Sequence, residues 1–203
     1  MPAELQSPTA TYGRLTRPSW FWAQRATSST LAGMDLINAS GSLFHFSFPS
    51  QMNSATTVGN TVKISTPTLS WERVGSNVNE GPAAIYRNGR TWIVYSASGC
   101  AGTGYKLGRL ELTGSNPLSA GSWTKFGNPI FQTANGQYQP GHNGFFQSKS
   151  GNQTWNVYHA NTNTPGACDG SRYTAVQPVD WNSDGTPNLG SPRPLSENIP
   201  EPV

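Results

Sequence analysis

The sequence has few charged residues and no long apolar runs. Only 11% of its 203 residues are Asp, Glu, Lys or Arg, and the 13 basic residues are scattered without a cluster. Because nucleic-acid-binding proteins concentrate basic residues on one face, the net charge of +3 does not indicate a nucleic-acid partner. No run approaches the roughly 18 apolar residues that a membrane-spanning helix requires, so we expect no membrane partner either.

The N-terminus also lacks the apolar core of a secretory signal peptide, since it reads MPAELQSPTA. Two glycosylation sequons, beginning at Asn38 and Asn152, and the abundance of Ser, Thr and Asn nevertheless favour an extracellular protein.

Cysteine is scarce, and Cys100 and Cys168 are the only two in the sequence. Each lies in a Gly-rich loop that follows a predicted strand containing Tyr. Equivalent loops could bring the two thiols together as one disulfide. Two buried free thiols are the alternative.

Turn-forming residues, in contrast, are abundant, with 22 Gly and 16 Pro. Between residues 79 and 97, Glu80 precedes an apolar run, an Asn88-Gly89 turn follows, and the chain returns through a strand rich in β-branched and aromatic residues. This pattern predicts a β-hairpin with a carboxylate at its mouth. The chain as a whole is predicted to be all-β.

The same layout occurs again further along the chain. At an offset of 63 residues, the positions Trp92, Val94, Tyr95 and Ala97 fall on Trp155, Val157, Tyr158 and Ala160, and Glu80-Gly81 falls on Asn143-Gly144. The predicted strands are 82–86, 91–96, 106–112 and 123–126 in the first unit, and 145–147, 154–159 and 173–178 in the second. Repeated four-stranded units with an aromatic strand are typical of a β-propeller. The alternative is a two-sheet sandwich made of the same strands.

The expected propeller is incomplete. Residues 1–40 show no sustained hydrophobic period and are predicted to be poorly ordered, whereas residues 41–203 form the β domain. Propellers typically have 4 to 8 blades, but this domain holds about two full blades plus strands of a preceding one.

The innermost strand of a propeller blade lines the central channel. Glu80 and His142 both lie near the start of such a strand, so we expect their side chains to converge on one site. An exposed loop carboxylate is the alternative for Glu80.

Five runs of the sequence form recognisable motifs: VNEGPAAIYRNG at 78–89, IVYSASGC at 93–100, YKLG at 105–108, WTK at 123–125 and QPGHN at 139–143. These motifs resemble those of family 43 glycoside hydrolases, in particular their α-L-arabinofuranosidases. The resemblance extends over about residues 60–194 and covers the latter half of such enzymes. It implies a five-bladed propeller whose axial pocket takes a terminal furanose or pyranose unit of arabinan or arabinoxylan.

The same resemblance implies roles for individual residues. Glu80 matches the general acid, which must stay protonated near neutral pH in order to protonate the leaving oxygen. His142 matches a channel residue that often lies beside a bound cation, so we expect it to bind substrate or, through water, Ca²⁺. Arg172 is expected to contact substrate hydroxyls, and no cofactor is required.

The sequence departs from the family in its other carboxylates. Inversion requires a general base about 6.5–9.5 Å from the acid, but the family's two aspartates lie in earlier blades whose motifs are missing here. The acids before Glu80 are Glu4, Asp35 and Glu72, and none matches. We therefore predict the C-terminal portion of an inverting exo-hydrolase, truncated at its N-terminus and nearly inactive by itself. A non-catalytic carbohydrate-binding fragment and an unstable fragment are the alternatives.

Overall fold

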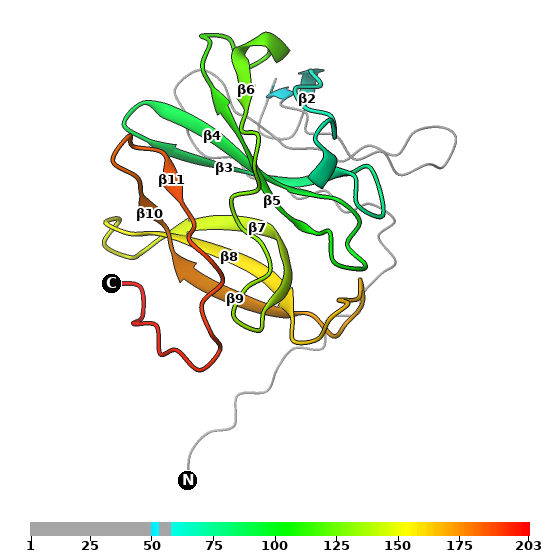
Figure 1. Ribbon diagram of the computed structural model, residues 1–203. Helices are drawn as coiled ribbons and strands as arrows, with labels where there is room; N and C mark the ends of the chain where they lie inside the picture. Colours follow the sequence, from blue (N-terminus) through cyan, green and yellow to red (C-terminus); the bar gives the residue numbers. More distant parts are fainter. Residues whose placement is uncertain (1–49, 53–57) are drawn as a thin grey trace, which may run out of the picture.

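The computed structural model describes residues 50–52 and 58–203. The predicted poorly ordered segment, residues 1–40, and the beginning of the predicted domain lie outside these ranges. The described chain is all-β, with antiparallel strands and two short 3-10 helices, η1 (Ser70–Glu72) and η2 (Ala120–Ser122) (Figure 1). Over this part of the chain, no helix is long and apolar enough to cross a membrane.

The first sheet is a four-stranded antiparallel meander. Its strands, in spatial order, are β3 (Asn79–Arg87), β4 (Arg90–Ala97), β5 (Lys106–Leu112) and β6 (Trp123–Lys125). Asn88 and Gly89 join β3 to β4 with φ values of 50° and 75°. Positive φ at both central residues is the requirement of a type I′ hairpin turn, so the predicted hairpin is confirmed.

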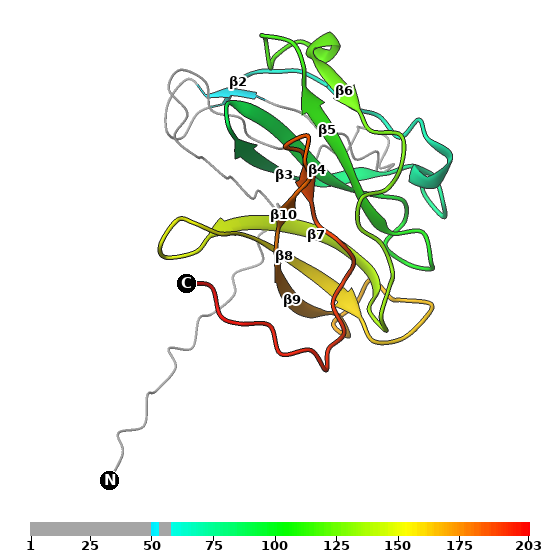
Figure 2. The same ribbon diagram turned by 60° about the vertical axis from the view of Figure 1, so that its left-hand side comes forward.

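The second sheet contains β7 (Tyr138–Gln147), β8 (Thr154–Asn161) and β9 (Tyr173–Pro178). Two further pairs stand apart from both sheets, β1 (Ser50–Met52) with β2 (Val58–Thr61) and β10 (Asp180–Trp181) with β11 (Pro187–Asn188). Figures 1 and 2 show β3, β4 and β5 stacked over β7, β8 and β9.

Apolar side chains fill the space between the two sheets. Trp92 and Val94 of β4 pack there with Leu107, and Tyr158 and Ala160 of β8 close the cluster from the other side. The alternate residues of β4 point to the opposite face, where a second cluster contains Ile93, Tyr95, Ala97, Ile64, Leu110 and Trp123. Since β4 is buried on both faces, it is nearly continuously apolar.

The strand pairing corrects the predicted equivalence of the two units. Glu80 of β3 pairs with Ser96 of β4. His159 of β8 is the counterpart of Ser96, and it pairs with Gly141 of β7. The offset is therefore 63 residues between β4 and β8 but 61 between β3 and β7. Gly141, not Asn143, occupies the place of Glu80.

Turn length explains this difference. Arg87 pairs with Arg90 across two turn residues, whereas the N–H of Ser148 bonds to the carbonyl of Gln153 across four, residues 149–152. Each unit then has a β-bulge, and Gly81 and His142 occupy the equivalent bulge position with φ values of 54° and 46°. His142 therefore adopts a left-handed backbone conformation, and its counterpart in the first unit, Gly81, is a glycine, for which this conformation carries no steric cost.

Candidate active site

A buried network fixes the start of β3, where Glu80 lies. Asn79, the preceding residue, is fully buried. Its side-chain amide donates a hydrogen bond to Glu72 Oε1 at 3.0 Å and its Oδ1 accepts one from Ser65 at 2.9 Å. Because a buried amide with satisfied partners cannot shift without losing them, the network holds the backbone beside Glu80 in place.

Glu72 is the centre of this network and not a free carboxylate. Its Oε2 accepts hydrogen bonds from the N–H groups of Thr68 and Leu69, and Oε1 accepts one from Tyr95. Lys125 Nζ lies 2.8 Å from Oε1. Burial opposes the charge, but the donors, with Lys125 the strongest, hold the pKa of Glu72 below its ordinary value. Glu72 is therefore an ionised anchor for β3.

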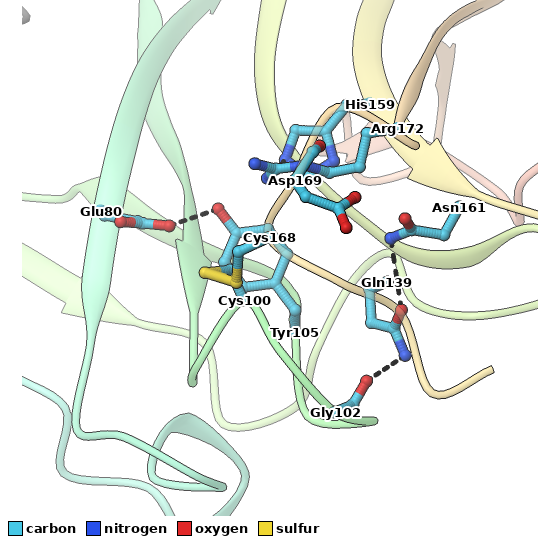
Figure 3. Close-up of a disulfide and its surroundings, with 10 residues drawn as sticks. All are labelled: Glu80, Cys100, Gly102, Tyr105, Gln139, His159, Asn161, Cys168, Asp169 and Arg172. Carbon is cyan, nitrogen blue, oxygen red and sulfur yellow. Dashed lines mark hydrogen bonds between the residues drawn. A yellow bond between two sulfur atoms is a disulfide. The ribbon is translucent and has the colours of Figure 1, made fainter. Parts of the chain in front are cut away.

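The carboxylate of Glu80 contacts a buried phenol. Tyr105, just before β5, donates its hydroxyl to Glu80 Oε1 at 2.5 Å (Figure 3). The Tyr105 ring is 1% exposed and stacks on the imidazole of His159, with ring centroids 5.6 Å apart and planes inclined by 11°. On Gly141, a Cβ would lie only 2.1 Å from Tyr105 Cε1, so glycine is required for the ring to occupy this position.

His142 and Arg172 lie in the same neighbourhood. The His142 ring covers Gly81, where an added Cβ would lie 3.0 Å from its Cγ, and its side chain is exposed. Arg172 Nη1 lies 3.2 Å from His159 Nε2. A guanidinium can only donate, so His159 accepts this hydrogen bond as a neutral imidazole. The fold thus gathers Glu80, His142 and Arg172 around the stacked rings of Tyr105 and His159.

The protonation of His159 predicts a pH dependence of stability. Burial, followed by the charges of Arg172 and His142, lowers its pKa from 6.5 to about 4. Between these values the unfolded chain binds a proton that the folded chain does not, so we expect the free energy of unfolding to fall as the pH falls from 6.5 to about 4. Urea denaturation at several pH values should show a smaller slope in His159→Gln than in the wild type. Identical slopes would contradict the prediction.

The structure joins Cys100 and Cys168 in a disulfide, with Cα atoms 5.5 Å apart. It links the loop before Tyr105 to the loop before Arg172 (Figure 3). Gly102 and Gly166 form an isolated β-bridge between the same loops. The Gln139 side chain also donates to the Gly102 carbonyl. These links fix the loops that precede Tyr105 and Arg172.

No described group of three or more His, Cys, Asp or Glu side chains is placed to hold a metal ion. The described residues around His142 therefore do not supply a ligand set for the predicted Ca²⁺, and no chemical step is assigned to one.

Three residues of the site, Tyr105, Ser96 and His159, were not predicted from the sequence. Ser96 could have been found, because the Asn88-Gly89 turn fixes the register that places it opposite Glu80. Tyr105 and His159 carry no such local signal. Their contact depends on how the two sheets pack.

Comparisons with known proteins agree on one family. The model of "Glycosyl hydrolases family 43" matches residues 48–187. An extracellular exo-α-(1→5)-L-arabinofuranosidase of Streptomyces avermitilis is 46% identical over 147 residues, or 69% of this chain and 30% of that protein. The α-L-arabinofuranosidase 43 of Humicola insolens is 43% identical over 143 residues, or 67% of this chain and 30% of that protein.

The structural likeness extends further along the chain than these alignments. The crystal structure of an α-L-arabinofuranosidase from Lactobacillus brevis superposes with a TM-score of 0.77 and 31% identity, covering 88% of this chain and 57% of that one. The chain spans only 30% of the length of the two curated relatives. Since the family model matches well over half of the sequence, this protein belongs to glycosyl hydrolase family 43.

Proposed function

We propose that the chain carries the general acid of a glycosidase that removes terminal α-L-arabinofuranosyl, or β-xylosyl, units from arabinan or arabinoxylan. One observation supports this most strongly: Glu80 lies at a β-bulge and is hydrogen-bonded to the buried Tyr105, with His142 against the neighbouring Gly81 and Arg172 bonded to the His159 ring that stacks on Tyr105. The names of the similar arabinofuranosidases support the substrate class. The word extracellular in one of them supports a secreted protein.

In this proposal the two sheets are consecutive blades of a five-bladed propeller. The structural likeness to the Lactobacillus brevis arabinofuranosidase, of which 57% is covered, supports it. The sheet-to-sheet core through Trp92 and Tyr158 is the packing that neighbouring blades require.

The proposed reaction is inverting hydrolysis. Glu80 protonates the glycosidic oxygen as the bond between this oxygen and the terminal sugar breaks. A base on the opposite face of the sugar ring deprotonates the attacking water. Arg172 and His142 contact sugar hydroxyls. The general base is not assigned to any described residue, and loss of a base typically lowers the rate by about 10²- to 10⁴-fold.

The purified chain should therefore release arabinose from an aryl α-L-arabinofuranoside far more slowly than full-length relatives do. We expect Glu80→Gln to abolish this residual rate. Glu197→Gln is the control, because Glu197 is an exposed partner of Arg193. A rate equal to that of full-length relatives would contradict the low activity, and an unchanged rate in Glu80→Gln would contradict the acid role.

Calorimetric titration with arabinose oligomers tests the alternative function. Saturable binding without any turnover by the wild-type chain would favour a non-catalytic carbohydrate-binding fragment. Binding together with a Glu80-dependent rate favours the hydrolase.

A further inference from the structure

We propose that Tyr105 is a positioning residue that decides which carboxyl oxygen of Glu80 carries the acid proton. This inference rests on the proposed role of Glu80 as the general acid. It concerns the hydrogen bond from Tyr105 to Glu80 and the neighbouring Ser96, which pairs with Glu80 across the sheet and accepts a hydrogen bond from the backbone of His142.

Two hydrogen bonds set the roles of the hydroxyl groups beside Glu80. The backbone N–H of His142 can only donate, and it donates to Ser96 Oγ at 2.6 Å. Ser96 is fully buried. The Tyr105 hydroxyl donates to Glu80 Oε1 at 2.5 Å. Ser96 acts on the same phenol and favours its ionised form, against the larger effect of burial on the pKa of Tyr105.

Glu80 Oε1 is therefore an acceptor. A proton on Oε1 would place two protons between oxygens that are 2.5 Å apart, where only one fits. When Glu80 is protonated, the proton consequently lies on Oε2. In the reaction this O–H bond breaks as the glycosidic oxygen takes the proton. The carboxylate that remains is stabilised by the hydrogen bond from Tyr105.

Packing keeps Tyr105 in the donor position. The His159 ring stacks on the Tyr105 ring. Gly141 lets the backbone of β7 lie against the Tyr105 ring, because it has no Cβ. Burial, with the nearby Glu80 carboxylate, raises the pKa of Tyr105 well above its ordinary value. The phenol therefore keeps its proton over the whole range in which a glycosidase works.

Nuclear magnetic resonance of the full chain, labelled with ¹³C in Glu carboxyl groups and Tyr rings, tests the proposal without requiring activity. We expect a slowly exchanging hydroxyl proton correlated with the Tyr105 ring. It should move upfield in Glu80→Gln, because a neutral amide accepts a weaker hydrogen bond than a carboxylate does. The Tyr105 hydroxyl signal should be present both below and above the pH at which the Glu80 carboxyl resonance changes.

Tyr95→Phe is the matched control for Tyr105→Phe. Tyr95 is also fully buried and donates to a carboxylate, that of Glu72. We expect the Glu80 carboxyl resonance to shift more in Tyr105→Phe than in Tyr95→Phe, because Tyr95 acts on Glu80 only through Glu72 and Asn79.

Two results would overturn the proposal. One is a Glu80 resonance that is the same in Tyr105→Phe and in the wild type. The other is loss of the Tyr105 hydroxyl signal at the Glu80 step, which would show that protonated Glu80 donates to Tyr105. If Tyr105→Phe does not fold, two measurements with Tyr105 in place still test the proposal: the shift of the Tyr105 hydroxyl signal in Glu80→Gln and the pH dependence of that signal in the wild type. A Glu80→Gln variant with unchanged turnover would refute only the general-acid role.

Discussion

Replacing Glu72 with Ala is expected to lower the free energy of unfolding by about 3–5 kcal/mol, the usual cost of leaving one member of a buried ion pair alone. The side chain of Glu72 is fully buried, and that of Lys125 is 18% exposed. The substitution removes the carboxylate oxygens that accept hydrogen bonds from Lys125, Tyr95 and the Asn79 amide, and it leaves Lys125 with neutral acceptors alone, the Thr66 carbonyl and Asn79 Oδ1. Urea denaturation followed by Trp fluorescence measures the change.

Two controls separate charge burial from general damage. Glu197→Ala removes an exposed carboxylate paired with Arg193 and should change stability by less than about 1 kcal/mol. The double variant Glu72→Leu with Lys125→Met removes both charges and should recover part of the loss. A loss below about 1 kcal/mol in Glu72→Ala would contradict the anchoring role.

The ion pair also has a defined pH signature. Because the pKa of Glu72 is lowered from 4.5 in the folded chain, its contribution is complete above that value and is lost as the pH falls below it. Between pH 6.5 and 4.5 only the His159 effect changes, so the two effects can be separated there. The network around Glu72 ends at Asn79, next to Glu80. Glu72→Ala should therefore also weaken the binding of arabinose oligomers.

Replacing Cys100 and Cys168 together with Ser is expected to lower the free energy of unfolding by about 4 kcal/mol. The bond closes a loop of 68 residues, and a crosslink of that span restricts the unfolded chain by about this amount. Denaturation of the oxidised wild type and the double variant gives the difference.

Wild-type protein reduced with dithiothreitol is the control, and its stability should match that of the double variant. A difference below about 1 kcal/mol between the oxidised and reduced proteins would contradict the prediction. The loops before Tyr105 and Arg172 lose their covalent link in both forms, so the Tyr105 hydroxyl resonance should also broaden.

Local sequence patterns were sufficient for much of the fold. The Asn88-Gly89 turn predicts its own hairpin because both residues tolerate positive φ, and the alternation along β4 follows from the two-residue period of a strand. The strands of the meander from β3 to β6 pair with their sequence neighbours, which is the usual arrangement of consecutive strands.

The second unit shows the limit of such patterns. Its sequence aligned well along β8, but the two extra turn residues moved β7 by two positions, so Gly141 took the place of Glu80. A repeat recognised in one strand of a hairpin does not fix the register of the partner strand, because turn length and bulges are set independently for each hairpin.

By itself, the sequence determined the strands of the two sheets except the first part of β7, the hairpin turn and, through its motifs, Glu80 as the candidate acid, because these depend on neighbouring residues. Only the tertiary structure decided that Tyr105 donates to Glu80 and that Glu72 anchors β3. It also stacked His159 on Tyr105. These partners are 7 to 54 residues apart, counting Glu72 with Asn79 and Tyr105 with His159. Tyr105 and His159 meet only because two sheets pack on one core, whereas Glu72 reaches Asn79, and Tyr105 reaches Glu80, through the folding of the loops around the first sheet. No local preference encodes these contacts.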